Sequence, residues 1–131
     1  MTDVPEQLSL SIRGDSPRAV DLPAPVAAVL RAAQKVAFAT RIVRGCWGVG
    51  IGLKRRWELR GDCCCALSAY LLDSEAVAGP RETSPIATAA RLLGVEPAQV
   101  VEFTRGFDGA PWIDSDWYRY GVRVAKEVVV P

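Results

Sequence analysis

The chain has 131 residues, half of them hydrophobic, and its formal net charge is only +1. This length is typical of one domain, and the apolar content excludes an intrinsically disordered chain. No apolar run is long enough to cross a membrane, and the first residues are too acidic and polar for a secretory signal. We therefore expect a cytoplasmic protein that has no membrane partner and keeps its four cysteines as free thiols.

The near-neutral total conceals an uneven distribution of charge along the chain. Residues 13–60 contain ten basic and three acidic side chains, a net charge of +7, whereas residues 61–131 contain six basic and ten acidic ones, a net charge of −4. This division predicts either ion pairing within the fold or two faces of opposite sign. We expect any acidic or polyanionic partner to bind through the first half of the chain.

The N-terminal part of the chain divides into an arm and a helical domain. Residues 1–23 are rich in Pro, Ser and Asp, which predicts a flexible or partly extended arm. The helical domain follows over residues 24–131. Its first helix is expected to run from about residue 24 to 44, because Pro25 suits the first turn of a helix and Gly45 suits its end.

A glycine-rich stretch follows the first helix. Glycine alternates with apolar residues over residues 48–53, and this period of two predicts a strand whose glycine side lies against another group. Residues 54–60 are expected to return as a second strand and complete a short hairpin. The glycine spacing fits neither a phosphate-binding loop nor a dinucleotide-binding fingerprint, so no nucleotide cofactor is expected.

Four cysteines and the absence of histidine limit the chemistry open to the chain. Asp62 suits an N-cap, so a helix is predicted from about residue 63 to 72, with Cys63, Cys64 and Cys65 in its first turn. Neighbouring side chains on a helix diverge by about 100°, so three consecutive cysteines cannot converge on one metal ion. No acid–base or nucleophilic pattern favours an enzyme, although a reactive Cys63 at the helix start stays open as a thiol-dependent alternative.

Residues 84–105 have the pattern of a helix-turn-helix, the unit that many proteins use to read DNA. Gly94 suits a left-handed turn between two helices, and Pro97 suits the first turn of the second helix. Gln99 and Arg105 are the candidate DNA contacts on the outer face of that helix. The same helix carries glutamates that phosphates would repel, so an αα-hairpin packed into the core is the competing interpretation.

The C-terminal region predicts a turn and one more helix. Residues 106–109 are Gly-Phe-Asp-Gly, a composition typical of a turn. The last helix is expected to begin near Asp114 or Ser115, since either residue suits an N-cap.

Several short motifs, taken in chain order, resemble those of a loose group of small uncharacterised bacterial proteins. The motifs are Trp47-Gly48, Cys64-Cys65-Ala66-Leu67-Ser68-Ala69, Leu93-Gly94-Val95, Phe103, Gly106-Phe107-Asp108-Gly109 and Tyr120-Gly121. The group shares a Cys-Cys-x-Leu-x-Ala helix and a Gly-Phe-Asp-Gly turn, and the resemblance covers about residues 36–126. It implies a mostly helical single domain in which these motifs shape the architecture, and it implies no activity, because the group has no assigned function.

The sequence therefore predicts a mainly α fold, one small domain of about five helices with one short β-hairpin. We expect a non-catalytic accessory protein, without metal or cofactor, that binds a partner through a basic face. The candidate residues of that face are Arg31, Lys35, Lys54, Arg55, Arg56 and Arg60. A protein is the expected partner; the alternative is a DNA-binding regulator that uses residues 84–105. The sequence does not indicate an oligomeric state.

Overall fold

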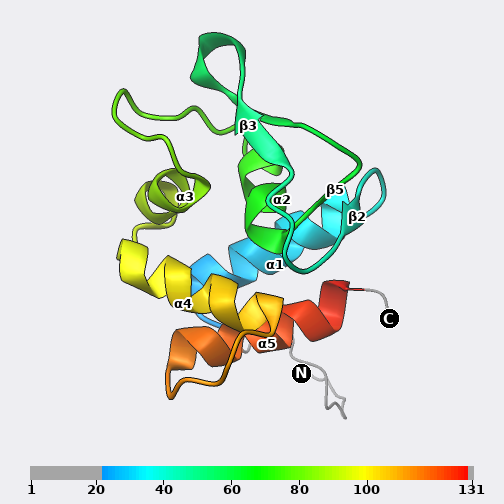
Figure 1. Ribbon diagram of the computed structural model, residues 1–131, viewed down its shortest axis with the longest axis vertical. Helices are drawn as coiled ribbons and strands as arrows, with labels where there is room; N and C mark the ends of the chain where they lie inside the picture. The colour runs from blue at the N-terminus through cyan, green and yellow to red at the C-terminus, as the bar shows by residue number, and fades with distance from the viewer. Residues whose placement is uncertain (1–21, 130–131) are drawn as a thin grey trace, which may run out of the picture.

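The computed structural model of the chain describes residues 22–129 and has a mainly α fold with two short β-pairs (Figure 1). Within these residues there are five α-helices, as the sequence predicts: α1 (Ala24–Val36), α2 (Ala66–Asp73), α3 (Pro85–Leu93), α4 (Pro97–Asp108) and α5 (Asp116–Val128). Almost all of the predicted arm over residues 1–23 lies outside the described residues, so its form stays a prediction.

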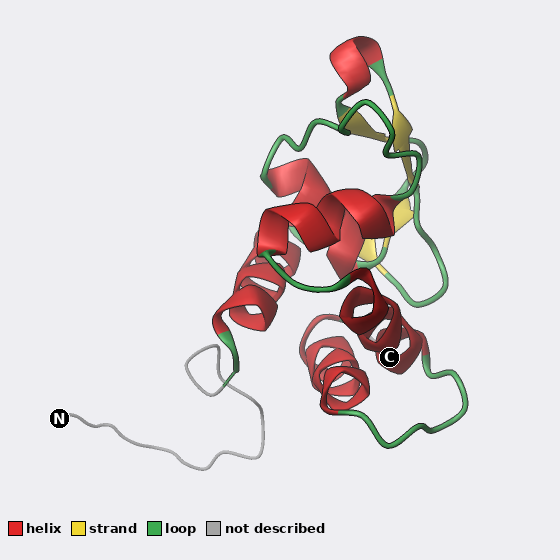
Figure 2. Cartoon of the chain, turned by 90° about the vertical axis from the view of Figure 1, so that its left-hand side faces the viewer, coloured by secondary structure: helices red, strands yellow, loops and turns green. Residues whose placement is uncertain are grey.

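The strands lie together in one part of the molecule (Figure 2). β3 (Val49–Ile51) and β4 (Trp57–Leu59) form the antiparallel hairpin that the glycine pattern predicts. A short 3₁₀ turn, η2 (Leu53–Arg55), forms the tip of this hairpin, so the predicted start of the second strand at residue 54 is wrong. β2 (Arg41–Ile42) pairs in parallel with β5 (Cys63–Cys64), which brings the residues after α1 next to the residues before α2.

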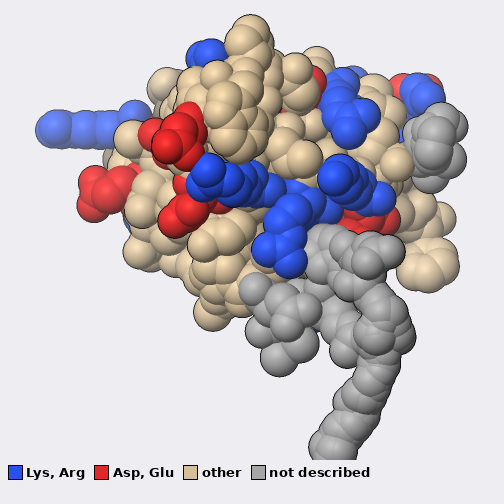
Figure 3. Space-filling model, turned by 90° about the horizontal axis from the view of Figure 1, so that it is seen from below, with Lys and Arg blue, Asp and Glu red and all other residues tan. Residues whose placement is uncertain are grey.

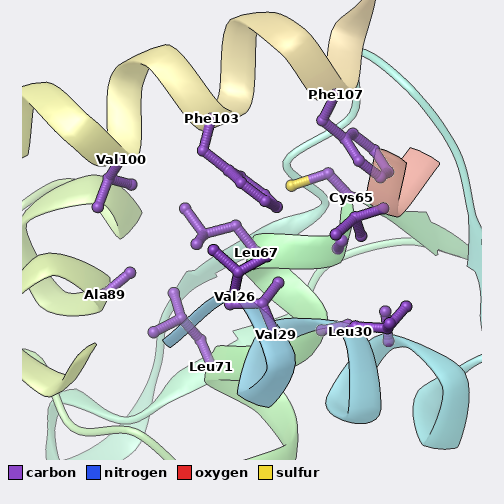
Figure 4. Close-up of a cluster of buried hydrophobic side chains, with 14 of the residues drawn as sticks. Val26, Val29, Leu30, Cys65, Leu67, Leu71, Ala89, Val100, Phe103 and Phe107 are labelled. Atoms are coloured by element: carbon purple, nitrogen blue, oxygen red, sulfur yellow. The ribbon is translucent and has the colours of Figure 1, made fainter. Parts of the chain in front are cut away.

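Helix α2 is the centre of the core and contacts α1, α3, β4 and α5. Its sequence has almost no polar face, which is typical of a helix that is covered on all sides. Leu67 is 2% exposed and Leu71 is fully buried. Figure 4 shows the side chains packed around them: Val26, Val29 and Leu30 from α1, Ala89 from α3, and Val100, Phe103 and Phe107 from α4. Burial of each large side chain stabilises the fold by about 1.5–3 kcal/mol.

Helices α4 and α5 meet at a close contact that two glycines permit. Gly106 lies against the backbone oxygen of Tyr118, and Gly121 lies against the backbone oxygen of Phe103. A Cβ atom at either glycine would overlap main-chain atoms of the other helix. The close approach packs the two helices tightly enough that Phe103 and Phe107 are 3% and 1% exposed.

The first helix is shorter than predicted. α1 ends at Val36, and the expected extension to residue 44 is wrong. Phe38 is 94% exposed, so another turn would gain no burial to stabilise it. The chain instead turns and enters β2, and Val43, directly after this strand, donates a backbone hydrogen bond of 2.9 Å to Cys64. Pairing with β5 therefore replaces the last two predicted turns of helix.

The second helix begins later than predicted, and the fourth ends later. Cys63 lies in β5 and Cys65 is the N-cap of α2, so the predicted helix start at Asp62 is wrong. Strand pairing takes the backbone groups that a helix would need.

The predicted turn over residues 106–109 is also wrong for its first three residues. They continue α4, because the last turn of this helix packs on α5. Only Gly109 has left-handed backbone, with φ of 77°.

Replacing Gly121 by alanine should destabilise the protein by about 3 kcal/mol, because the added methyl group overlaps the backbone of α4. Urea denaturation followed by tryptophan fluorescence measures the loss. Gly61→Ala is the matched control, since a Cβ there meets nothing within 4 Å, and its stability should stay within about 1 kcal/mol of wild type. Equal midpoints for the two variants would show that the helices do not approach so closely.

Candidate partner-binding site

The six basic residues of the predicted face lie at three places in the fold. Arg31 and Lys35 lie on α1. Lys54, Arg55 and Arg56 lie at the hairpin tip, and Arg60 follows β4. The hairpin tip stands at one end of the molecule, apart from α1, in both ribbon views (Figures 1 and 2). The structure therefore gathers the three basic residues of the tip at one place and does not join them to those of α1.

The backbone of the hairpin tip is strained. Lys54 and Arg55 have φ angles of 55° and 59°, a left-handed conformation that residues other than glycine rarely adopt. Short backbone hydrogen bonds close the tip: Gly52 donates to Arg56 over 2.7 Å, and Arg56 donates to Leu53 over 3.1 Å. Two consecutive strained residues require support from the surrounding structure.

The Arg55 side chain supplies much of that support. Its guanidinium donates to three backbone carbonyls of the loop before α3: to Ala78 at 3.3 Å, to Gly79 at 2.9 Å and to Glu82 at 2.6 Å. Ala78 in turn donates its backbone N–H to the Arg55 carbonyl over 2.8 Å. Arg55 is therefore a positioning residue that fixes the tip against the loop. Its guanidinium is hydrogen-bonded within the fold.

A polar network holds this loop in place. The Glu82 carboxylate accepts hydrogen bonds from Arg91 at 2.8 and 3.0 Å, from Thr88 at 2.8 Å and from the Gly79 backbone at 2.7 Å. The buried Trp57 indole donates to the same Thr88 hydroxyl over 3.0 Å. The pKa of Glu82 is lowered to about 2, chiefly by the hydrogen bonds from Arg91. Burial opposes this shift, and the hydrogen bonds from Gly79 and Thr88 make smaller contributions that lower the pKa further.

The tip presents one apolar and two basic side chains to solvent. Leu53 is 85% exposed, and Lys54 and Arg56 are exposed beside it. Within residues 22–129 neither basic side chain has an ion-pair partner, whereas Arg60 pairs with Glu58 at 3.6 Å. The exposed tip therefore offers a small cationic surface with an apolar centre.

Sequence reasoning identified the basic residues of the tip and missed its supports. Leu53 precedes three basic residues directly, a signal that could have marked it as exposed. Glu82 lies in the loop before α3, whereas Thr88 and Arg91 lie within that helix, and no local sequence pattern connects the three with Trp57. The network is therefore a product of tertiary contacts.

Positive charge is not confined to the first half of the chain. Figure 3 views the molecule from below in Figure 1 and shows Lys and Arg side chains gathered near the middle of that face, close to acidic ones. In α5, Arg119 pairs with Asp114 at 2.6 Å and with Asp116 at 3.0 Å. Lys35 pairs with Asp73 at 3.2 Å. The Lys35–Asp73 pair joins the basic half of the chain to the acidic half, as one of the two sequence interpretations expects, whereas both pairs of Arg119 lie within the acidic half.

The candidate DNA contacts lie on the predicted helix pair. α3 and α4 are joined through Gly94, which has the left-handed φ of 71° that the turn requires. Gln99 accepts a hydrogen bond of 2.9 Å from the Glu96 backbone, so its side chain caps α4. Arg105 is exposed. The carboxylate of Glu102 accepts a hydrogen bond from Ser115.

The four cysteines differ in exposure. Cys64 and Cys65 are buried, whereas Cys46 and Cys63 are half-buried and their sulfur atoms lie 2.9 Å apart. The hydrogen bond with Cys63, with further contributions from burial and neighbouring charge, raises the pKa of Cys46 to about 11. Burial raises the pKa of Cys64 to about 12. In the part of the chain that the structure describes, no group of three Cys, Asp or Glu side chains is placed to hold a metal ion.

Comparisons with protein-family models, with curated proteins and with solved structures each found no match to this chain. No helix within residues 22–129 is long and apolar enough to cross a membrane.

Glu82→Gln should lower stability at pH 7 by about 2 kcal/mol, because it removes charge-assisted hydrogen bonds to Arg91. In the folded protein the pKa of Glu82 lies below its usual value of 4.5. The ionised carboxylate therefore makes its full contribution to the free energy of unfolding above about pH 5, and this contribution disappears as the pH falls toward 2. Urea unfolding at several pH values should therefore show the wild type and the variant converging in acid. Glu127→Gln on α5 serves as the control, and its free energy of unfolding should follow that of the wild type at every pH. If the difference in unfolding free energy between the wild type and Glu82→Gln did not change with pH, the ionised network would be excluded.

Proposed function

We propose that this chain is a small accessory protein, without catalysis of its own, that binds an acidic protein partner through the tip of the β3–β4 hairpin. The observation that carries the proposal is the strained backbone of Lys54 and Arg55. Strain of this kind costs about 1–3 kcal/mol for each residue and is concentrated at functional sites. Here it is not compensated by burial at the tip, because Leu53 and Lys54 face solvent.

The anchoring of the tip supports a binding role. Three side-chain hydrogen bonds from Arg55 hold the hairpin on the loop before α3, so the exposed residues are held in one arrangement before a partner arrives. Such preorganisation reduces the entropy lost on binding. Lys54 and Arg56 are then available to attract carboxylates, and Leu53 supplies apolar contact area at their centre.

The proposed site is smaller than the face that the sequence predicts. Lys54 and Arg56 are kept as contacts, and Arg55 becomes a positioning residue because its guanidinium is bonded within the fold. Arg31 and Lys35 lie on α1, apart from the tip, and are not needed for this surface.

A DNA-binding regulator that uses residues 84–105 is the alternative proposal. The left-handed turn at Gly94 and the exposed Arg105 support it. The capping role of Gln99 and the glutamates of α4 weigh against it, because phosphate contacts supply much of the affinity for DNA. We therefore treat DNA binding as one outcome of the experiment that tests the hairpin tip.

The double variant Lys54→Glu, Arg56→Glu should lose the partner that the wild type captures from native lysate of the source cells, because both attractive charges are reversed. The variant Arg105→Glu, Lys126→Glu changes the net charge by the same amount at the other end of the molecule, and it should keep the partner. Both captures are repeated after nuclease treatment, with mass spectrometry of the retained proteins and thermal melting to confirm folding.

The outcomes separate the two proposals. Specific proteins retained by the wild type and the control pair, but not by the tip variant, would support the hairpin tip. Material that disappears after nuclease, or that the Arg105→Glu, Lys126→Glu protein alone fails to bind, would favour DNA binding through α4. Capture that survives both double substitutions would rule out each site.

A further inference from the structure

We propose that Cys46 and Cys63 form a dithiol that is oxidised reversibly to a disulfide by a small disulfide such as oxidised glutathione. Their sulfur atoms lie 2.9 Å apart, so a bond of about 2 Å requires a movement of less than 1 Å. Both residues are half-buried rather than enclosed in the core.

The position of Cys63 follows from strand geometry. Successive side chains of a strand point to opposite faces, so within β5 Cys64 faces the core and Cys63 faces away from it. Cys64 is fully buried and Cys65 is 4% exposed. The Cys65 thiol is engaged with the Ser68 hydroxyl at 3.5 Å. Of the three consecutive cysteines, the first is therefore the one available to a partner sulfur.

The position of Cys46 is fixed from both sides of its loop. On one side the Gly45 backbone donates to the Asp108 carboxylate over 2.9 Å, at the end of α4. On the other side Arg60 donates a backbone hydrogen bond of 2.7 Å to the Gly48 carbonyl. Gly48 has a φ of 64°, and a side chain there would overlap the Cys63 carbonyl. Glycine at this position therefore allows the loop to lie directly on Cys63.

A small pocket lies beside Cys46. It has a volume of about 60 Å³ and is lined by Gly45, Cys46, Trp47, Cys65, Thr104 and Asp108. The Thr104 hydroxyl is buried and has no hydrogen-bond partner among the described residues. Cys46 is only half-buried, so its side chain borders this pocket and is not enclosed in the core.

The oxidation proceeds by two thiol–disulfide exchanges. One cysteine loses its proton to solvent, and its thiolate attacks a sulfur of the small disulfide. That S–S bond breaks, a mixed disulfide forms on the protein, and one small thiolate leaves and is protonated. The second cysteine, deprotonated in turn, attacks the protein sulfur of the mixed disulfide and displaces the second small thiol. Two cysteine thiols are oxidised, and one small disulfide is reduced to two thiols.

Proximity makes the second exchange the favoured fate of the mixed disulfide. The second sulfur is already in contact with the first, so the reaction is intramolecular and has a high effective concentration. The resulting bond would close a loop over residues 46–63 that contains the whole β3–β4 hairpin. Oxidation would thus fasten the base of the hairpin to β5.

In the test, the reduced 131-residue chain is treated with oxidised glutathione under native conditions, its remaining thiols are blocked, and it is digested with trypsin. Cleavage at Arg and Lys separates Cys46, in residues 45–54, from Cys63, in residues 61–81. We expect these two peptides to be joined, with two of the four thiols left free and all four restored by a reductant. Four free thiols after treatment, a persistent glutathione adduct on the wild type, or a bond between neighbours within residues 61–81 would each overturn the proposal.

Matched variants assign the partners. Cys63→Ser should abolish the cross-link and leave a stable glutathione adduct on Cys46, since no second sulfur can displace it. Cys64→Ala should keep the cross-link. Loss of the cross-link in Cys64→Ala but not in Cys63→Ser would contradict the assignment. Fragmentation of the linked wild-type peptides identifies the bonded cysteines directly. It therefore tests the assignment of Cys46 and Cys63 even if a variant does not fold.

Discussion

The burial of α2 is the constraint on which the rest of the structure depends. A helix with almost no polar face must be covered on all sides, and here α1, α3, α5 and β4 provide the cover. The contribution of β4 is Trp57, a large side chain only 3% exposed. Because Trp57 belongs to the hairpin, the hydrophobic core also decides where the hairpin stands. The exposed tip is therefore attached to the hydrophobic core through Trp57.

Polar contacts connect the apolar core to the hairpin tip. The Trp57 indole needs a hydrogen-bond acceptor once it is buried, and Thr88 supplies one. Thr88 in turn donates to Glu82, whose carboxylate also binds Arg91. The loop held by these contacts is the one whose carbonyls accept the hydrogen bonds of Arg55. A continuous set of interactions thus connects the core with the strained tip, and it explains how that backbone persists without being buried.

The sequence predicts some features of this fold well because their causes are local. Gly94 adopts the left-handed turn and Ser115 caps α5, each as its own chemistry requires. The errors occur where distant segments compete for the same residues. Cys63 and Cys64 enter β5 because Arg41 and Ile42 lie beside them. The sequence likewise predicted the basic residues of the tip but not which of them are exposed. Their exposure depends on contacts with a loop more than twenty residues further along the chain.

The order of the helices, the hairpin and the single small domain were determined by the sequence alone, through periodicity, capping residues and glycines that act within a few positions. Tertiary structure alone decided that Arg55 is bonded to Gly79 while Arg56 faces solvent, and that Cys46 lies against Cys63. The physical reason is the range of the interactions. Propensities and caps depend on neighbours along the chain, whereas contacts between side chains far apart in sequence exist only after the core has brought their segments together.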